Sequence, residues 1–265
     1  MPPRRVPLSV PAVRSLALLP LALVACTTPR MPPPPVAACI TTLDAGDAFT
    51  KNALEGTFVV RDETTGCTRT TDAALADTGF RPQSTFKIPN TLIGLETGVI
   101  EGEHHTWKWD GTPRKLKDWD QDLDLGGALK VSCVPCFQDV ARRVGEARMH
   151  TWLRDLHYGN EDIGGPIDQF WLDGPLRITP RGQTEFVHRM LAGELPVKKA
   201  NVELLWRLLD IEHGPDFTYR GKTGLGTLDG RAIGWRSWAT PSTRATASCT
   251  RRSSGARRAR PRSPR

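Results

Sequence analysis

The chain has 265 residues, of which 38% are hydrophobic, enough for one sizeable core or for a domain with a large insertion. A formal net charge of +7 suggests an anionic partner, but nine arginines and no Lys, Asp or Glu lie between Arg236 and Arg265, and subtracting these nine leaves −2. The basic balance therefore belongs to the end of the chain, and we predict no nucleic-acid partner for the protein.

Residues 1–25 have the features of an export signal. Arg4 and Arg5 precede a short apolar run, which lacks the roughly 20 residues that a membrane span needs. The run ends in the sequence LVAC at 23–26, which resembles the lipobox of bacterial lipoproteins, where the cysteine is acylated and becomes the mature N-terminus. We predict an exported, periplasmic protein that a lipid on Cys26 anchors to the outer or cytoplasmic membrane. Ordinary cleavage after a small residue, with an incidental cysteine, is the alternative.

Residues 26–53 are expected to form a tether and an N-terminal segment, with a proline-rich spacer in their first part. A strand follows at 56–62, rich in β-branched residues, and a turn leads to a return strand at 67–71. Cys39 and Cys67 flank the first strand, and in an exported chain they can form a disulfide.

The next helix is predicted to begin at an S-x-x-K sequence, from Ser84 to Lys87. A serine and a lysine three positions apart lie one above the other in a helix, which brings a hydroxyl and an amine within reach of each other. Pro89 cannot donate to the preceding turn, so we expect an irregular start before a regular helix over 90–99.

Residues 100–130 are polar and loop-like, and the sequence SCV at 132–134 leads into a helix predicted over 134–156. Cys133 and Cys136 are expected to be either buried thiols or a strained pair. No further Cys or His follows at ligand spacing, so no metal site is predicted.

The middle of the chain continues with YGN at 158–160 and FWL at 170–172, both in a predicted loop. Thr179 and Pro180 are a helix cap and a proline at the first helical position. A further helix is predicted over 201–211.

Two strands are predicted near the end, at 217–223 and 231–238, and the first carries the sequence KTG at 222–224. Residues 239–265 contain no Leu, Ile, Val, Phe, Tyr or Trp, a composition that cannot bury a core. We therefore predict an incomplete sheet whose last strand is an unpaired edge, and hence a poorly soluble, weakly active chain. The basic tail is interpreted as frameshifted or disordered, with a nucleic-acid-binding arm as the alternative.

Taken in order, these short sequences resemble the motif set of the class D β-lactamases (oxacillinases). The resemblance covers about residues 54–238. It implies the α/β (α+β) fold of serine β-lactamases and penicillin-binding proteins, an antiparallel sheet built from both chain ends with a helical insertion. Trp235 to Trp238 is one residue short of the family's Trp-x-x-Gly-Trp. The arginine that the family places beyond this point to bind the substrate carboxylate has no match here.

The resemblance implies that the enzyme hydrolyses β-lactams, with Ser84 as the nucleophile. Lys87, carboxylated by carbon dioxide or bicarbonate, is the implied general base, and no other cofactor is implied. An ordinary lysine is protonated at neutral pH, so its amine needs an apolar setting, which disfavours the charged form. Ser132 is expected to pass a proton to the leaving nitrogen.

The remaining predicted residues line the substrate site. Lys222 and Thr223 are expected to bind the substrate carboxylate, Trp171 to donate to the carbamate, and the backbone N–H groups of Ser84 and Leu225 to form the oxyanion hole. The full predicted substrate-binding set is Lys222, Thr223, Gly224, Leu225, Val134, Trp171 and Leu172. Three alternatives stay open: a penicillin-binding peptidase, a β-lactam sensor domain, and a non-catalytic remnant.

Overall fold

The computed structural model describes residues 39–45, 47–215, 217–228, 231–240 and 245–253. The predicted export signal, Cys26 and the proline-rich spacer lie outside the described residues. Within these ranges, no helix is both long enough and apolar enough to cross a bilayer.

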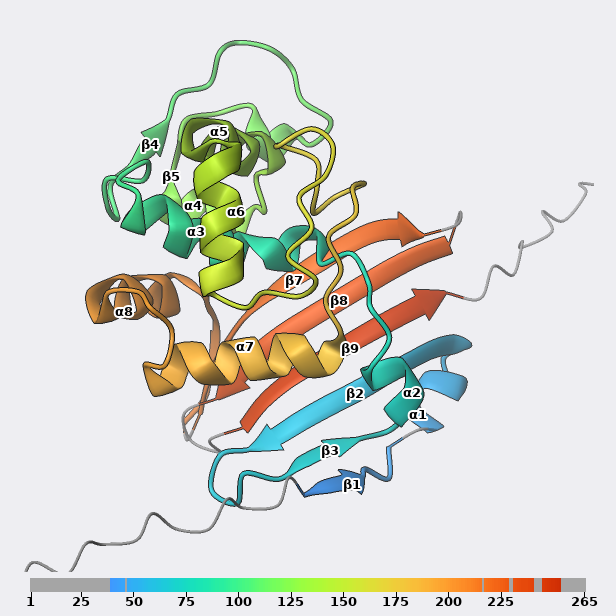
Figure 1. Cartoon of the computed structure of the whole chain (residues 1–265). Coiled ribbons are helices and arrows are strands. Elements are labelled where there is room, and N and C mark those ends of the chain that lie inside the picture. Colours follow the sequence, from blue (N-terminus) through green and yellow to red (C-terminus); the bar gives the residue numbers. More distant parts are fainter. Residues whose placement is uncertain (1–38, 46, 216, 229–230, 241–244, 254–265) are drawn as a thin grey trace, which may run out of the picture. The chain divides into compact units, whose positions relative to one another are not determined.

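A seven-stranded sheet runs through the structure in the order β1-β3-β2-β9-β8-β7-β6 (Figure 1). Its strands are β1 (Ile40–Thr42), β2 (Leu54–Asp62), β3 (Thr68–Thr70), β6 (Asp210–His213), β7 (Thr218–Leu228), β8 (Arg231–Thr240) and β9 (Ala245–Ser253). β1 and β3 pair in parallel, and the other neighbours are antiparallel. The sheet therefore joins strands from both ends of the described chain, as predicted.

The prediction of an incomplete sheet is wrong. β8 is not an edge, because β9 pairs with it on one side and with β2 on the other, in a register that sets Trp235 opposite Thr250 and Phe58 opposite Cys249. Strand pairing is made by backbone N–H and C=O groups, which every residue except proline supplies in full. The lack of large apolar side chains in this segment argued against a core, but it does not prevent the backbone from completing a ladder.

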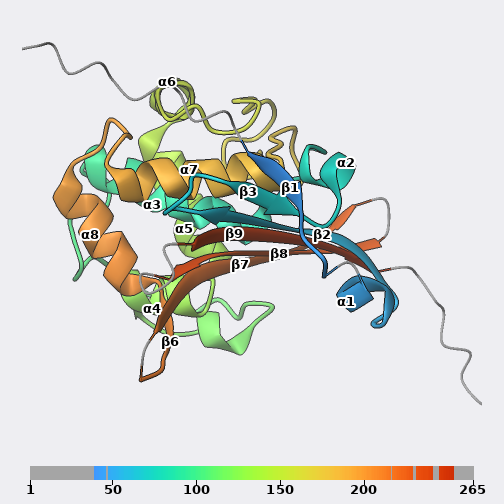
Figure 2. The same cartoon turned by 90° about the horizontal axis from the view of Figure 1, so that it is seen from below.

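Helices cover both faces of the sheet (Figure 2). α7 (Pro180–Ala192) lies along one face and contacts β2 and β9, while the short α1 (Asp47–Thr50) contacts β2 from the opposite face. The other helices are α2 (Ala73–Ala76), α3 (Lys87–Glu96), α4 (Leu125–Lys130), α5 (Val134–Val144), α6 (Glu146–Asp155) and α8 (Lys199–Leu208). Thr179 caps α7 as predicted, since its Oγ1 accepts the N–H of Gly182 at 2.9 Å.

Several predicted elements differ from the structure: the helix predicted over 90–99 is α3, Lys87–Glu96, and the strand predicted at 217–223 continues to Leu228 as β7. The long helix over 134–156 is divided into α5 and α6 at Gly145, whose φ of 79° is a left-handed conformation that glycine adopts at little cost. The helix at 201–211 ends earlier, and its last residues enter β6. The loop over 100–130 also contains the short strands β4 (Thr106–Trp107) and β5 (Leu123–Asp124), and a 3-10 turn at Lys117–Trp119.

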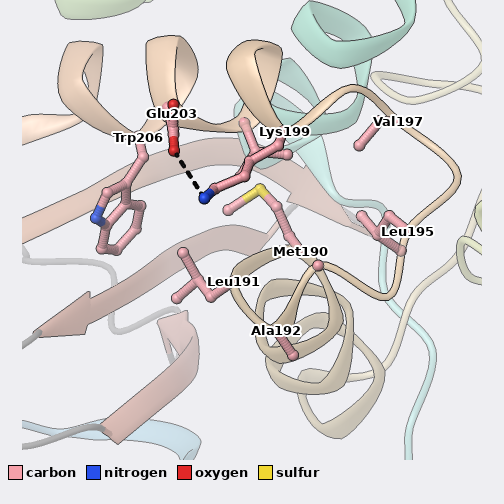
Figure 3. A pocket seen from close by; sticks show the side chains of 10 residues that line it. Met190, Leu191, Ala192, Leu195, Val197, Lys199, Glu203 and Trp206 are labelled. Atoms are coloured by element: carbon pink, nitrogen blue, oxygen red, sulfur yellow. Dashed lines mark ion pairs between the residues drawn. The ribbon is translucent and has the colours of Figure 1, made fainter.

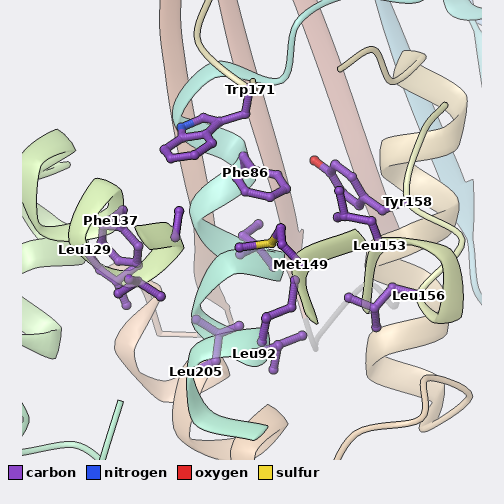
Figure 4. Packing of buried hydrophobic residues seen from close by; sticks show 14 of the residues in the cluster. Phe86, Leu92, Leu129, Phe137, Met149, Leu153, Leu156, Tyr158, Trp171 and Leu205 are labelled. Atoms are coloured by element: carbon purple, nitrogen blue, oxygen red, sulfur yellow. The ribbon is translucent and has the colours of Figure 1, made fainter. Parts of the chain in front are cut away.

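The hydrophobic core lies between the helices around α3 (Figure 4). Phe86, just before this helix, contacts the rings of Trp171, Tyr158 and Phe170, with centroids 5.1–5.6 Å away. The Tyr158 hydroxyl, fully buried, donates to Gln183 Oε1 at 2.9 Å, which satisfies its polar end inside the core. Tyr158 is therefore part of the support behind α3.

A separate cavity of about 480 Å³ lies where α7 meets α8 (Figure 3). Apolar side chains including Met190, Leu195 and Trp206 line it, and Lys199 and Glu203 form an ion pair of 3.6 Å on α8. None of the side chains predicted for the site is among its lining residues.

Candidate active site

Ser84 lies in a 3-10 segment, Gln83–Phe86, which leads directly into α3. Gln83 has a φ of 52°, a conformation that is rare for residues other than glycine. Two contacts hold it there: its backbone N–H donates to the Trp171 carbonyl at 3.2 Å, and its Nε2 donates to the Leu172 carbonyl at 2.8 Å. The irregular start predicted from Pro89 is confirmed, and the 170–172 loop fixes the turn that presents Ser84.

The sheet supports the same turn from the other side. Trp235 on β8 donates its Nε1–H to the Arg81 carbonyl at 2.7 Å. At Gly224 on β7, a Cβ atom would lie 3.2 Å from the backbone nitrogen of Ser84 and 3.0 Å from the Pro82 carbonyl oxygen. Glycine therefore allows β7 to approach the turn that carries Ser84 at a distance that a side chain would obstruct.

Lys87 and Ser84 are in direct contact, as the S-x-x-K spacing predicts. The Lys87 Nζ donates to Ser84 Oγ at 3.0 Å, and the lysine is 1% exposed. Burial, with the nearby positive charge of Lys222 as a second cause, holds the pKa of Lys87 well below its usual value. The Nζ also lies 5.3 Å from the centroid of the Phe137 ring. The amine is thus in the apolar setting that favours its neutral form.

Lys222 is the second buried amine of the site. It is 5% exposed, its Nζ donates to the Thr223 carbonyl at 3.0 Å, and burial lowers its pKa to about 8. In the β7–β8 ladder it is directly opposite Ser237, whose buried hydroxyl has no hydrogen-bond partner among the described residues. Side chains directly opposite each other in an antiparallel pair project from the same face, so this hydroxyl lies beside the lysine.

Ser132 occupies the junction between α4 and α5. Its N–H donates to the Leu129 carbonyl at 3.2 Å, and the Cys133 N–H donates to the Ala128 carbonyl at 2.8 Å, the two bonds of a Schellman motif. The motif needs a left-handed residue, and Ser132 supplies it with a φ of 55° where glycine is usual. Its Oγ is buried and has no hydrogen-bond partner within the described residues.

Trp171 is fully buried and stacks on Phe86 with ring centroids 5.2 Å apart. Figure 4 shows its indole beside Phe86 at the start of α3. In the part of the chain that the structure describes, its Nε1–H has no acceptor. A buried N–H without an acceptor costs about 1–3 kcal/mol, so an acceptor bound in the site would relieve this cost.

The predicted substrate-binding side chains form a more open boundary. Thr223 is exposed, and Leu225 is 77% exposed. Val134 and Leu172 are half-buried. Close contacts thus join the Ser84 turn to Lys87, Gly224 and the 170–172 loop. For Ser132, the structure gives the backbone hydrogen bonds and a buried hydroxyl, but no direct contact with these residues is described.

Comparison with known proteins gives one consistent result. The family of the penicillin binding protein transpeptidase domain matches residues 47–240. Beta-lactamase OXA-10 of Pseudomonas aeruginosa is 44% identical over 190 residues, 71% of this chain and 71% of that protein. Beta-lactamase OXA-48 of Klebsiella pneumoniae is 40% identical over 187 residues, again 71% of each. The crystal structure of a class D β-lactamase from Bacillus subtilis superposes with a TM-score of 0.75 at 36% identity, covering 80% of this chain and 90% of that one.

The chain belongs to the class D β-lactamase family. The fold predicted from the motif set, that of serine β-lactamases and penicillin-binding proteins, is confirmed by the structural match.

Three residues of this class D site were not predicted from the sequence. Gln83 bends the turn that carries Ser84, Phe137 lies next to the Lys87 amine, and Ser237 lies opposite Lys222. A signal existed for Phe137, because an aromatic residue in the first turn of the helix after Ser132 belongs to its buried side. For Gln83 and Ser237 the sequence carried none.

Proposed function

We propose that this class D protein hydrolyses β-lactam antibiotics through an acyl-enzyme on Ser84. The contact of 3.0 Å between a buried, pKa-depressed lysine and the serine hydroxyl carries the proposal. Such a lysine can be neutral at physiological pH, and a neutral base in contact with a hydroxyl is what an activated serine requires. The names of the relatives, which are β-lactamases, support the same reaction.

We further propose that Lys87 is carboxylated. The fit of its surroundings supports this: Trp171 Nε1 is a buried donor without an acceptor, and Ser132 Oγ is a buried hydroxyl without a partner. Trp171 and Ser84 would hold the two carbamate oxygens by hydrogen bonds. When present, the carbamate supplies a base for proton removal from Ser84 and from the water that hydrolyses the acyl-enzyme.

The chain's own residues would divide the remaining work. Ser84 Oγ attacks the β-lactam carbonyl carbon, the C–N bond breaks, and the Ser132 hydroxyl delivers a proton to the nitrogen. Lys222 provides positive charge for the substrate carboxylate, which Thr223 also binds. The backbone N–H groups of Ser84 and Leu225 stabilise the oxyanion, and Val134, Leu172 and Leu225 contact the apolar part of the substrate.

The proposed location of the protein is the periplasm, with a lipid on Cys26 as its anchor. The apolar run and the sequence LVAC at 23–26 support it. Cells that express the protein should retain it in the membrane fraction and label it with radioactive palmitate, and Cys26→Ser should abolish the label. Soluble, unlabelled wild-type protein in the periplasm would leave ordinary signal cleavage.

The test of the function is turnover of a chromogenic cephalosporin by the purified chain, with Ser84→Ala as the decisive variant. Wild type should hydrolyse the substrate, whereas Ser84→Ala should lose at least about a thousandfold in kcat, because no covalent intermediate can form. Thr151→Ala, which removes an exposed hydroxyl on α6, is the matched control and should retain full activity.

The intact mass of the protein after exposure to penicillin separates the rival functions. A persistent adduct on Ser84 without turnover would identify a penicillin-binding peptidase or a sensor domain. Neither adduct nor turnover would identify a non-catalytic remnant.

A further inference from the structure

A disulfide bond joins Cys133 to Cys136 immediately after Ser132. Cys133 is the last residue of the Schellman motif that ends α4 and also the cap of α5, while Cys136 lies in the first turn of α5. The crosslink therefore ties the residue next to Ser132 to a rigid helix. The reaction described above assigns no task to this bond.

Both cysteines also line a polar cavity of about 380 Å³. Trp119 forms part of its wall and donates to the Val131 carbonyl at 3.1 Å, so the cavity adjoins the backbone just before Ser132. Arg114 and Arg142 line it as well, each bound to an aspartate at 2.7 Å. A cavity of this volume admits a small thiol, although the cysteines themselves are 2% and 6% exposed.

The two sulfur atoms are not equivalent toward such a thiol. As a whole residue Cys136 is the more exposed of the two, so we infer that an incoming thiolate attacks its sulfur. Cys133 Sγ accepts the backbone N–H of Cys136 at 3.2 Å, at the N-terminal end of α5. Donors and positive potential at a helix start stabilise a thiolate, which makes Cys133 the better leaving group.

The crosslink has a structural consequence for Ser132. Its φ of 55° is unfavourable for a residue with a Cβ, and such a conformation persists when the surroundings hold it. The two backbone bonds of the Schellman motif hold it from the α4 side. The disulfide restrains Cys133 from the α5 side, and without it the junction can relax to a right-handed conformation that turns the Ser132 hydroxyl away.

We propose that the Cys133–Cys136 disulfide is a thiol-sensitive switch that controls the position of the Ser132 hydroxyl. A small thiolate attacks Cys136 Sγ, the S–S bond breaks and the electron pair leaves on Cys133. A second thiol then releases Cys136, so that two thiols are oxidised to one disulfide and the protein gains two thiol groups. Reduction slows acylation of Ser84, a consequence that rests on the proposed function.

The experiment compares the oxidised full chain with the same chain after anaerobic treatment with 2-mercaptoethanol. Early quenching with iodoacetamide, followed by peptide mass mapping, should show mercaptoethanol on Cys136 and the alkylated thiol on Cys133. The fully reduced protein should acylate with penicillin at least about fivefold more slowly, and reoxidation should restore the rate. Cys39→Ser/Cys67→Ser, which removes two cysteines that form no disulfide in the structure, should respond as wild type does.

A second variant separates reduction from nonspecific damage by the thiol. Cys133→Ser/Cys136→Ala keeps a capping oxygen for α5 and cannot form the bond, so it should be slow before and after thiol treatment, with a cooperative melting transition. Reduced wild type that acylates within twofold of the oxidised rate would overturn the proposal, as would the opposite adduct pattern. An oxidised chain that is never acylated would instead overturn the proposed function, together with the predicted effect of reduction on acylation. The adduct pattern would still show whether the thiol attacks Cys136.

Discussion

Lys87 and Lys222 are two amines buried near each other, and each is easier to deprotonate in the folded protein than in the unfolded chain. Between the folded pKa and the unfolded value the unfolded chain binds more protons, so the free energy of unfolding rises with pH across that interval. For Lys222 the interval runs from about 8 upward. At neutral pH, below this interval, Lys222 is charged although it is buried, which lowers the free energy of unfolding. A charge retained at this expense indicates a function that needs it.

The first prediction concerns carboxylation of Lys87. In degassed buffer near pH 5 the amine is protonated more readily and carbon dioxide is scarce, so turnover should fall several-fold and recover when bicarbonate is added. Steady-state rates with and without bicarbonate, from pH 5 to pH 8, measure this. Lys87→Ala should accumulate an acyl-enzyme or fail to react. Rates that do not change with bicarbonate at any pH would contradict carboxylation of Lys87, but not the role of Ser84 as nucleophile.

A second prediction at this scale concerns Lys222. If its charge binds the substrate carboxylate, kcat/KM should decline as pH rises through about 8, where Lys222 loses its proton. Lys222→Arg should move this decline above pH 9, since an arginine stays charged. Profiles of kcat/KM against pH for both proteins provide the measurement. An unmoved profile would assign the decline to another group.

At the scale of elements, the junction of α4 and α5 joins two helix ends in three residues, Val131 to Cys133. Ser132 takes the position where a Schellman motif favours glycine, and Cys133 ends one helix and caps the next. A left-handed conformation costs a residue with a Cβ about 1–2 kcal/mol. Serine therefore makes this junction less stable than glycine would, but it provides a buried hydroxyl that glycine lacks.

The variant Ser132→Gly tests both the backbone strain at this position and the need for the hydroxyl. The variant should melt at a temperature about 2–4 °C higher, because glycine relieves about 1 kcal/mol of backbone strain, while kcat falls at least about a hundredfold for want of the proton donor. Ser132→Ala is the matched control, because it also loses the hydroxyl but keeps the strain, so only its activity should fall. A lower melting temperature for the glycine variant would show that the junction is not strained.

Sequence patterns predicted elements where local chemistry decides the structure. Thr179 and Pro180 mark the start of α7, and the Ser84–Lys87 spacing gives the contact observed. They missed the break at Gly145, because the apolar periodicity continues across it. They could not predict the φ of Gln83 or the position of Ser237 opposite Lys222, since both depend on partners from distant parts of the chain.

For the whole molecule, the position of β9 matters most. It contributes nine paired positions with β2 and eight with β8, so it connects the strands from the two ends of the chain. The sequence did not predict this strand, because the prediction relied on the apolar content of residues 239–265, whereas strand pairing depends on the backbone. The basic end of the chain is thus divided into a part that completes the sheet and the residues after Ser253.

Two truncations test this division. Ending the chain after Thr240 removes β9 and leaves β2 and β8 each with one side unpaired, and it should yield an insoluble product without a cooperative melting transition. Ending it after Ser253 retains every described pairing, so that protein should melt as the full chain does. Circular dichroism melting of the soluble fractions measures both. A folded protein ending at Thr240 would show that β9 is dispensable.

The central position of β9 also determines when the sheet can form during synthesis. The strand that joins the two halves of the sheet is synthesised after all the other described strands, and until then β2 and β8 have one side unpaired. Contacts between residues so distant in sequence form slowly. The sheet of a newly made chain would therefore stay incomplete until β9 has been synthesised, which is compatible with the export proposed from the apolar run and the sequence LVAC at 23–26.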